Sequence, residues 1–222
     1  MGIEILYEDN HLLVAVKPPN IPVQGDITGA PDLLTLLKED IKIRYNKPGN
    51  VFLGLVHRLD RPVGGAIVFA RTSKAASRLS EQIRNHQMEK IYLCVVQGCP
   101  GPLKGRLTDT LLKDRENNVV SVVEEGTPGA KKAILDYEVL KSFQGLSLVK
   151  VSLVTGRSYQ IRVQMSNNKT PLVGDNKYGY RGDTRHNLAL WSHQIGINHP
   201  ITKERMLFTS SPPDQYPWTL FT

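Results

Sequence analysis

The sequence predicts an α+β fold in which most strand connections are antiparallel and helices are few. Short β-type runs bounded by turn residues recur along the whole chain, whereas only three segments show helical spacing. The 222 residues contain no internal repeat, no low-complexity tract and no convincing linker. A chain of this length can bury a substantial core, as one large domain or two small ones.

The predicted strands are short and rich in β-branched and aromatic residues, with Gly, Pro, Asn or Asp between them. They cover residues 3–7, 11–16, 55–56, 66–70, 90–96, 119–123, 133–140, 146–154, 188–193 and 206–209. Gln144-Gly145 predicts the turn of a hairpin. Residues 103–129 show the least pattern, and apart from 119–123 we expect loops there.

Three helices are predicted from apolar spacing and from residues that cap helix starts. Asp32 precedes a helix with Leu33, Leu36, Leu37 and Ile41 on one face. Thr72 or Ser73 caps a second helix that runs to about Gln87. Ser158 is expected to cap a short third helix that ends near Asn167.

The composition indicates a soluble protein with an anionic partner. The formal net charge is +7, which favours nucleic acid first and a membrane surface second. No signal peptide is recognised at the N-terminus and no apolar run is long enough to cross a bilayer. Two cysteines are too few for a disulfide framework, so we expect them to be reduced and the protein to be cytoplasmic.

The stretch from Gly54 to Arg71 places an acid, Asp60, between Arg58 and Arg61. Apolar runs flank it, and Pro62 with Gly64-Gly65 predicts a turn between two short strands. Catalytic and binding residues often lie at such a strand end, where a rigid scaffold holds them. For an arbitrary Asp between two arginines, however, a capping role or a simple ion pair is the better interpretation.

Common catalytic motifs are absent from the sequence. It has no phosphate-binding Gly-rich loop, no dinucleotide fingerprint, no Gly-x-Ser-x-Gly elbow and no His-x-x-x-His or paired-carboxylate metal site. We therefore expect no metal and no cofactor.

Five motifs in order resemble those of the RluA-type pseudouridine synthases. They are Tyr7 to Pro18, the tetrapeptide His57-Arg58-Leu59-Asp60, Lys90-Ile91-Tyr92, Thr155 to Val163, and Pro171 to Asp175 followed by Tyr178-Gly179. The closing Leu188-Ala189-Leu190 also fits. One tetrapeptide could arise by chance, whereas five in order over nearly the whole chain are specific.

The resemblance implies a fold, a reaction and a set of site residues. The fold is the pseudouridine synthase domain over residues 1–222, without an S4 domain, with a mixed, largely antiparallel central sheet and an active-site cleft across it. The reaction is the isomerisation of specific uridines in structured RNA to pseudouridine. The catalytic residues are Asp60 as the essential carboxylate, Arg162 as its partner, and Tyr92 against the target base. An Asp60–Arg162 pair would favour the charged carboxylate.

The resemblance also implies that RNA is contacted by Arg58, Arg61, Lys90 and Arg157. Arg58 would act as a wedge that fills the space left by the flipped uridine. By pattern alone, Tyr92 is a core tyrosine, Arg162 a surface charge or phosphate contact, and His57 a hydrogen-bonded structural histidine. Only the joint pattern raises Asp60, Tyr92 and Arg162 above those interpretations. The partner is a stem-loop of ribosomal or transfer RNA, and a monomer is the default.

The sequence departs from the family pattern at three places. Val63-Gly64-Gly65 replaces the usual Thr-Ser-Gly, Tyr159 stands in the place of a His, and Gln164 replaces another His. Two rivals to an active synthase remain. One is a catalytically silent RNA-binding or chaperone protein on the same fold. The other, a small unrelated basic module, is hard to reconcile with the motif order.

Overall fold

The computed structural model describes residues 2–25, 29–183 and 185–222, which form two compact units. Unit 1 contains the chain up to Lys90 and the segment Ser192–Ser211. Unit 2 contains Ile91–Trp191 and Pro212–Thr222. Both units are therefore discontinuous in sequence, and the larger segment of unit 2, Ile91–Trp191, is inserted within unit 1. A single catalytic domain over 1–222 stays a prediction.

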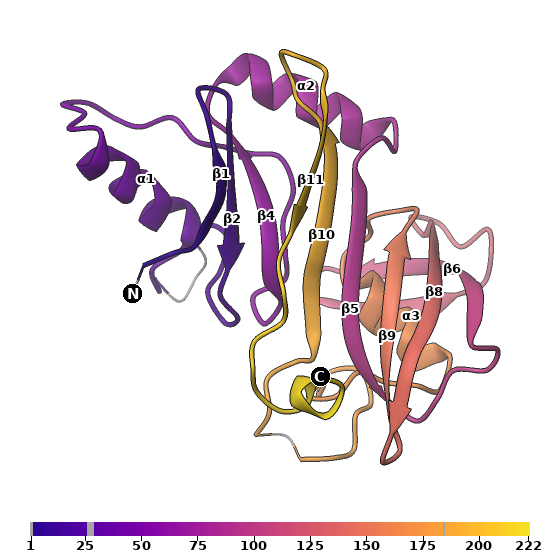
Figure 1. The fold of residues 1–222 in the computed structure, drawn as a ribbon. Helices are drawn as coiled ribbons and strands as arrows, with labels where there is room; N and C mark the ends of the chain where they lie inside the picture. The colour runs from indigo at the N-terminus through magenta and orange to yellow at the C-terminus, as the bar shows by residue number, and fades with distance from the viewer. Residues whose placement is uncertain (1, 26–28, 184) are drawn as a thin grey trace. The chain divides into compact units, whose positions relative to one another are not determined.

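Unit 1 is built on a sheet whose strands come from both of its chain segments (Figure 1). Its order is β1 (Ile5–Glu8), β2 (Leu12–Lys17), β4 (Gly64–Ala70) and β10 (Leu190–Asn198), the last counted from Ser192 onward in this unit. The short β3 (Gly54–Leu55) pairs with β4, and β11 (Arg205–Thr209) pairs with β10. The two predicted N-terminal strands are confirmed, and they form an antiparallel pair, β1 and β2.

Strands β4 and β10 run parallel, which makes this sheet mixed. At their starts, Ser192 Oγ donates to the carbonyl of Ala66 at 2.8 Å. At the other end of β4, the N–H of Arg71, the residue that follows β4, donates to the carbonyl of His11, the residue that precedes β2, at 2.8 Å. The His11 ring in turn lies 5.9 Å from the ring of His199, which directly follows β10. The starts of β4 and β10 therefore lie together, and so do their ends, as parallel strands require.

Both predicted helices of unit 1 are confirmed, together with their caps. Helix α1 (Leu33–Arg44) begins after Asp32, whose Oδ1 accepts the N–H of Thr35 at 3.0 Å. Helix α2 (Ser73–Arg84) begins after Thr72, whose Oγ1 accepts the N–H of Ala75 at 3.1 Å. Thr72 rather than Ser73 is therefore the cap. These bonds satisfy N–H groups that a helix start leaves unpaired.

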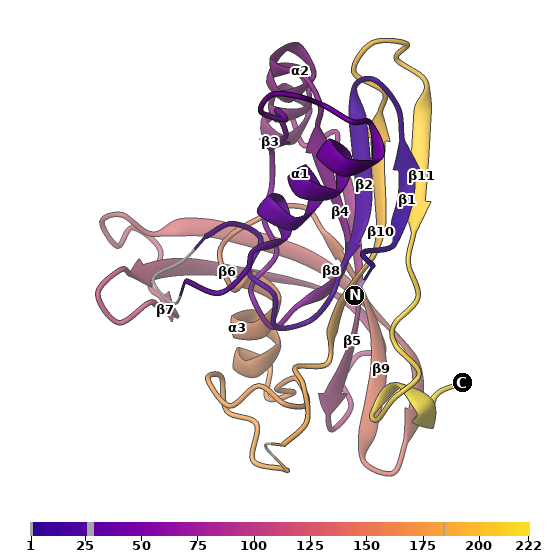
Figure 2. The same cartoon turned by 90° about the vertical axis from the view of Figure 1, so that its left-hand side faces the viewer.

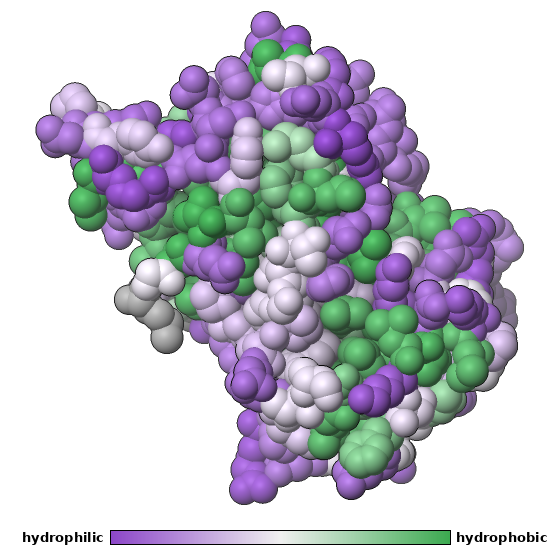
Figure 3. All heavy atoms as spheres, in the orientation of Figure 1, coloured by the Kyte–Doolittle hydropathy of each residue, from purple (hydrophilic) through white to green (hydrophobic). Residues whose placement is uncertain are grey.

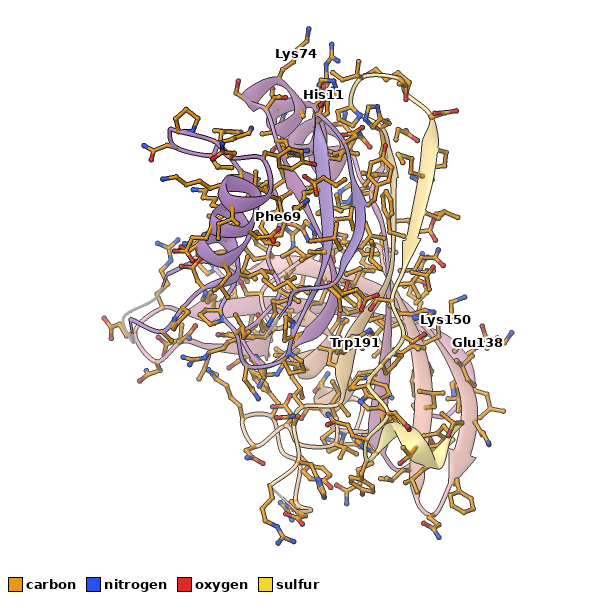
Figure 4. The ribbon with its side chains drawn as sticks, turned by 60° about the vertical axis from the view of Figure 1, so that its left-hand side comes forward. His11, Phe69, Lys74, Glu138, Lys150 and Trp191 are labelled. Atoms are coloured by element: carbon orange, nitrogen blue, oxygen red, sulfur yellow. The ribbon has the colours of Figure 1, made fainter. Side chains whose placement is uncertain are left out.

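The core of unit 1 packs α2 against alternate residues of the sheet. Its buried members are Leu12, Val14, Ala66, Val68, Ala70, Ala75, Leu79, Met88, Ile195, Ile197 and Phe208. Alternate residues of β4 stand on the other face, where Phe69 is fully buried (Figure 4). Because β4 is buried on both faces, its sequence is continuously apolar rather than alternating.

Unit 2 contains an antiparallel sheet of the order β5 (Glu89–Gln97), β9 (Leu146–Leu153), β8 (Lys131–Phe143), β6 (Lys104–Asp114) and β7 (Val119–Val123). Strand β5 belongs to this unit from Ile91 onward. The hairpin between β8 and β9 is confirmed. Gln144 and Gly145 both have positive φ, 49° and 75°, as the tight hairpin turn requires.

The expectation of loops over most of residues 103–129 was wrong. Strand β6 spans eleven residues of that region, and it pairs with both β7 and β8. Leu111 is the one residue of β6 that is buried, so its sequence lacks a sustained apolar alternation. Its strand structure depends on pairing with partners on both sides rather than on a local pattern.

Helix α3 (Gln160–Asn167) lies beside β6 and β7 in unit 2 (Figure 2). Its first six residues are buried, so it is a core helix rather than a surface one. The prediction that Ser158 caps it was wrong. Tyr159 occupies the cap position with φ 54° and gives no side-chain cap bond. Instead, Gln160 Oε1 accepts the N–H of Arg157 at 2.9 Å and holds the turn before the helix.

The β8–β9 hairpin presents a mixed surface. Apolar side chains gather over it (Figure 3), and Leu140 and Phe143 are its most exposed apolar residues in β8. Glu138 and Lys150 lie side by side across the hairpin (Figure 4), and Glu138 also pairs with Lys104 at 2.7 Å. None of the described helices is long and apolar enough to span a membrane. The predicted α+β class with a mixed, largely antiparallel sheet is confirmed.

Candidate active site

Asp60 lies in unit 1, half-buried in the turn between β3 and β4. The Val63 N–H donates to the Asp60 carbonyl at 3.0 Å and closes the turn. Leu59 and Val63 on either side are buried, at 7% and 2% exposure. Two apolar anchors therefore hold the backbone, while the carboxylate between them remains partly accessible. The predicted turn is confirmed, but Asp60 lies within it and not directly at the end of β3, which ends at Leu55.

Lys17, a residue to which we had assigned no role, holds this turn from below. Its side chain is fully buried at the end of β2. The ammonium donates to the carbonyls of Pro18, Ile21 and Arg61 at 2.8, 2.7 and 2.9 Å, which uses all three of its N–H donors. Burial lowers the pKa of Lys17 to about 7, and the nearby Asp60 carboxylate opposes this shift.

The loop after β2 and the Asp60 turn also bond to each other directly. The Asn20 N–H donates to the carbonyl of Arg61 at 2.8 Å, and Arg61 Nε donates to the carbonyl of Asn20 at 3.1 Å. The proline-rich segment that follows β2 is therefore an ordered loop whose function here is to support Asp60. Its prolines cannot donate to a sheet, which explains why the strand ends at Lys17.

Gly65 explains why the unusual turn sequence still closes. It has φ +110°, a conformation that side chains disfavour. A Cβ there would lie 2.3 Å from the carbonyl oxygen of Ser192 and 2.6 Å from its nitrogen. Gly65 is thus required by the close approach of β10 to the start of β4. The glycine that ends the family's usual turn has the same place here.

His57 is a structural histidine, as its default interpretation predicted. Its Nε2 accepts the N–H of Val68 in β4 at 3.0 Å, so the ring is neutral and carries its proton on Nδ1. Burial, with a smaller effect of Lys90, lowers the pKa of His57 to about 3. His57 therefore fixes the chain just before Asp60 to the sheet.

Tyr92 lies in unit 2, on β5, and is 7% exposed. It pairs in register with Val151 of β9, and its face of the strand also carries Cys94 and Val96, both fully buried. Burial raises the pKa of the Cys94 thiol to about 12, so this cysteine is a core residue and not a nucleophile. Tyr92 is thus rigidly placed.

Arg162 lies in unit 2, on α3, and forms a buried bidentate ion pair with Asp175. Nε donates to Oδ2 at 2.8 Å and Nη2 donates to Oδ1 at 2.7 Å. The Arg162 side chain is 8% exposed and that of Asp175 is 0% exposed. A guanidinium has five N–H donors, and this pair uses two of them. The pair fixes the plane of the guanidinium and leaves its Nη1 side outside the Asp175 contact.

Two tyrosine rings complete the surroundings of Arg162. Its Cζ lies 5.1 Å from the ring centre of Tyr159 and 5.0 Å from that of Tyr178. Each ring is held in turn, because the Tyr159 hydroxyl donates to Asn118 Oδ1 at 3.1 Å and the Tyr178 hydroxyl accepts the Val120 N–H at 3.0 Å. Cation–π contacts of this kind stabilise a desolvated guanidinium.

The motif from Pro171 to Tyr178 therefore fixes the position of Arg162, through Asp175 and Tyr178. The sequence alone did not reveal this role. Gly174 has φ +76°, and a Cβ there would lie 2.5 Å from the carbonyl oxygen of Asn187. The next residue, Asp175, also accepts the backbone N–H of Tyr178 at 3.2 Å. The only signal in the sequence was the family motif itself, which includes Gly174 and Asp175 but does not indicate that Asp175 contacts α3.

The departure at Gln164 has a structural account. Gln164 is fully buried, and its Nε2 donates to Asp109 Oδ2 of β6 at 2.7 Å. Asn167 Nδ2 donates to the other oxygen of the same carboxylate at 3.0 Å. The amide thus ties α3 to the sheet. Its Oε1 is buried with no hydrogen-bond partner among the described residues.

The predicted RNA-contact residues differ in exposure. Arg58, Arg61 and Arg157 are exposed, and Lys90 is half-buried. Burial lowers the pKa of Lys90. Arg157 is partly fixed, since its Nε donates to the carbonyl of Lys132 at 3.0 Å. Their contact with RNA stays a prediction. Within the described part of the chain, no group of three or more His, Cys, Asp or Glu residues could hold a metal ion.

Comparison with known proteins agrees with the motif order. The family model described as RNA pseudouridylate synthase matches residues 11–167. A Bacillus subtilis protein named an uncharacterized RNA pseudouridine synthase is 33% identical over 205 residues, which are 91% of this chain and 66% of that protein. Ribosomal large subunit pseudouridine synthase C of Yersinia pestis is 34% identical over 214 residues, 91% of this chain and 63% of that protein. The chain thus spans about two thirds of the length of these relatives.

The solved structures agree on the fold. Human RNA pseudouridylate synthase domain containing 4 superposes with a TM-score of 0.81 at 23% identity, over 95% of this chain and 89% of that one. The matched region contains His57 to Asp60, Tyr92 and Arg162. The family model covers well over half of the chain, and relatives exceed 30% identity over nine tenths of it. The chain therefore belongs to the RNA pseudouridylate synthase family, and its relatives are of the RluA type.

Proposed function

We propose that this protein isomerises specific uridines in structured RNA to pseudouridine, with Asp60 as the essential carboxylate. The observation that carries the proposal is the support of Asp60. Lys17, His57 and Gly65 each fix the backbone around this one residue, with hydrogen bonds or a contact that no larger residue could make. Such preorganisation is what a catalytic carboxylate needs and a capping residue does not.

The reaction breaks the bond between N1 of uracil and C1′ of ribose and forms a bond between C5 and C1′. The proton on C5 leaves and N1 gains one, so that no redox change occurs and no cofactor is required. Asp60 acts as nucleophile or as base in the first step. Tyr92 packs against the uracil and accepts the C5 proton. The geometry of Arg162 supports an electrostatic role, because a buried guanidinium held by Asp175 presents its charge in one orientation.

The pairing of Arg162 with Asp60 remains part of the proposal, as do the RNA contacts of Arg58, Arg61, Lys90 and Arg157. The first RNA to test is ribosomal, since several relatives are named ribosomal large subunit pseudouridine synthases C and D. Transfer RNA is the second. A net charge of +7 supports either polyanion.

The test uses ribosomal and transfer RNA from a strain that lacks the gene. Wild-type protein and the Asp60→Asn variant are each incubated with this RNA, and pseudouridine is mapped at single-nucleotide resolution. We expect one or a few new sites with wild type and none with Asp60→Asn. Asp40→Asn, a substitution in α1, is the matched control and should modify the same sites as wild type.

Two outcomes would contradict the proposal in different ways. If wild type introduces no pseudouridine but binds the RNA, the silent RNA-binding interpretation is correct. If Asp60→Asn is as active as wild type, the protein is a synthase and Asp60 is not its essential carboxylate. RNA binding by Asp60→Asn, measured by fluorescence anisotropy, shows that the variant is folded.

A further inference from the structure

Unit 2 contains a cavity of about 280 Å³ on the face of β7, β6 and β8 that packs against α3. Its floor includes Leu111 of β6 and Val120 of β7, each 4% exposed. Both residues belong to the core cluster between these strands and α3. The loop Gly156–Ser158, just before α3, forms one wall. The cavity therefore has a rigid base.

The rim of this cavity is cationic. Four basic side chains line it and no acidic one does: Lys113, Arg115, Lys131 and Arg157. The strand register explains their convergence. Lys113 is paired with Val120 and Lys131 with Leu111, so both lysines stand on the same face of the sheet as the floor residues. Arg157 reaches the cavity from the loop before α3.

Two carboxylates of β6, those of Asp109 and Asp114, are hydrogen-bonded to other groups. Asp109, on the same face of β6, accepts the amides of Gln164 and Asn167. Asp114 accepts the backbone N–H groups of Glu116 and Asn117 at 2.9 and 3.0 Å. Among the described residues, none of the four rim cations forms an ion pair with a carboxylate. The positive charge of the rim is thus available to a ligand.

We propose that this cavity binds a phosphate group of the RNA backbone. Four cations around a space without acids match a phosphodiester, and the hydroxyl of Ser158 adds a neutral donor. Gly129 and Gly156 in the lining have no side chain, so an RNA strand could approach the protein backbone closely there. This inference rests on the proposed function, since it assumes that RNA is the substrate. It adds Lys113, Arg115 and Lys131 to the RNA-contact residues.

The cavity is also close to Arg162. The Tyr159 ring, which stacks on the Arg162 guanidinium at 5.1 Å, lies 5.9 Å from the Lys113 ammonium. One aromatic ring therefore separates the cavity rim from the Arg162 group. If Arg162 faces the target uridine, the bound phosphate belongs to that nucleotide or to a close neighbour. The cavity would then position the target rather than increase affinity at a distance.

The experiment measures binding of a fluorescein-labelled RNA hairpin with a uridine-containing loop by anisotropy, over a series of salt concentrations. Lys113→Gln and Lys131→Gln remove one rim cation each. We expect each to weaken binding several-fold at low salt. The plot of log association constant against log salt, which falls with salt, should become less steep by up to about 1. The double variant should reduce the steepness further.

Lys132→Gln is the matched control, because Lys132 follows Lys131 on the same strand and points to the opposite face. It changes the net charge by the same amount, and we expect an unchanged slope. If Lys131→Gln and Lys132→Gln weaken binding equally, only the net charge matters and the cavity is not a phosphate site. Unchanged binding by the double variant would equally overturn the proposal.

A third arm tests the source of the phosphate. Isothermal titration with inorganic phosphate alone reports whether the cavity prefers a free anion. Phosphate binding that is lost in Lys131→Gln, together with unchanged RNA binding, would assign the cavity to a small anion and not to RNA. All of these readouts are binding measurements. If the protein binds the hairpin through this cavity yet forms no pseudouridine, the proposed reaction fails while the phosphate site stands.

Discussion

Among single residues, Lys17 has an unusual environment, since its charged side chain is fully buried. A buried ammonium is costly unless every donor is satisfied, and here three carbonyls from two separate segments satisfy it. Two of these carbonyls belong to the loop after β2, and the third belongs to the turn of Asp60. Through its bond to Arg61, 44 positions away in the chain, the lysine thereby supports the turn that presents the catalytic candidate Asp60.

Replacing Lys17 by Met should therefore destabilise the protein. Methionine fills a similar space but donates nothing, so three buried carbonyls lose their partner. We expect the free energy of unfolding to fall by about 3 kcal/mol or more, measured by urea denaturation. Lys42→Met, at an exposed position of α1, is the control and should change little. Equal midpoints for Lys17→Met and wild type would show that the three bonds do not support the turn.

His57 makes a second prediction, about pH. Its pKa is about 3 in the folded protein, well below the ordinary value, because burial disfavours the charged ring. As pH falls below about 6.5, the unfolded chain binds a proton that the folded protein refuses. This group therefore adds no pH dependence at higher pH and lowers stability progressively from pH 6.5 downward, by up to about 1.4 kcal/mol per pH unit.

The measurement is the free energy of unfolding of wild type and His57→Gln between pH 7.5 and 4.5, values chosen to lie on both sides of the ordinary histidine pKa of about 6.5. The difference between the two proteins should vary with pH in that window. His86→Gln, at an exposed histidine, should run parallel to wild type. If His57→Gln is also parallel, the ring is protonated in the folded protein and its bond to the Val68 N–H has been assigned wrongly.

Among the elements, the start of β4 is tightly constrained by the backbone of β10. Gly65→Ala should abolish folding or cost more than about 3 kcal/mol, because the added methyl group meets backbone atoms of Ser192 that cannot rotate away. Gly145→Ala, in the β8–β9 turn, has a similar positive φ and nothing within 4 Å, so it should cost only about 1 kcal/mol. Soluble expression and thermal unfolding compare the two. Similar losses would mean that φ alone decides both cases.

The elements also show how far the sequence could predict this molecule. Helices α1 and α2 were predictable because Asp32 and Thr72 cap them and apolar spacing continues. Strand β6 was not, since only one of its residues is buried and its strand structure depends on pairing with β7 and β8. The same reason applies to Asp175. Its contact with Arg162 depends on a loop closed by Gly174, and no local pattern indicates it.

At the scale of the whole molecule, unit 1 depends on a late segment of the chain. Ile195, Ile197 and Phe208 are members of its core, and they come from residues 192–211. A fragment of residues 2–90 should therefore lack a cooperative unfolding transition in far-UV circular dichroism. A fragment of residues 91–191, which holds most of unit 2, should retain one. The reverse result would show that the two units are not the cooperative parts of this protein.

The discontinuity of unit 1 also has a consequence for synthesis on the ribosome. Proteins elongate at about 5–20 residues per second, and unit 2 accounts for the chain between Lys90 and Ser192. The half of the molecule that carries Asp60 therefore waits on the order of 5–20 s, unfinished, while Ile91–Trp191, the larger part of the unit that carries Arg162, is synthesised. Its apolar strands are exposed during that interval. We expect this nascent chain to recruit a holdase chaperone soon after Phe69 leaves the exit tunnel and to release it once β10 is available.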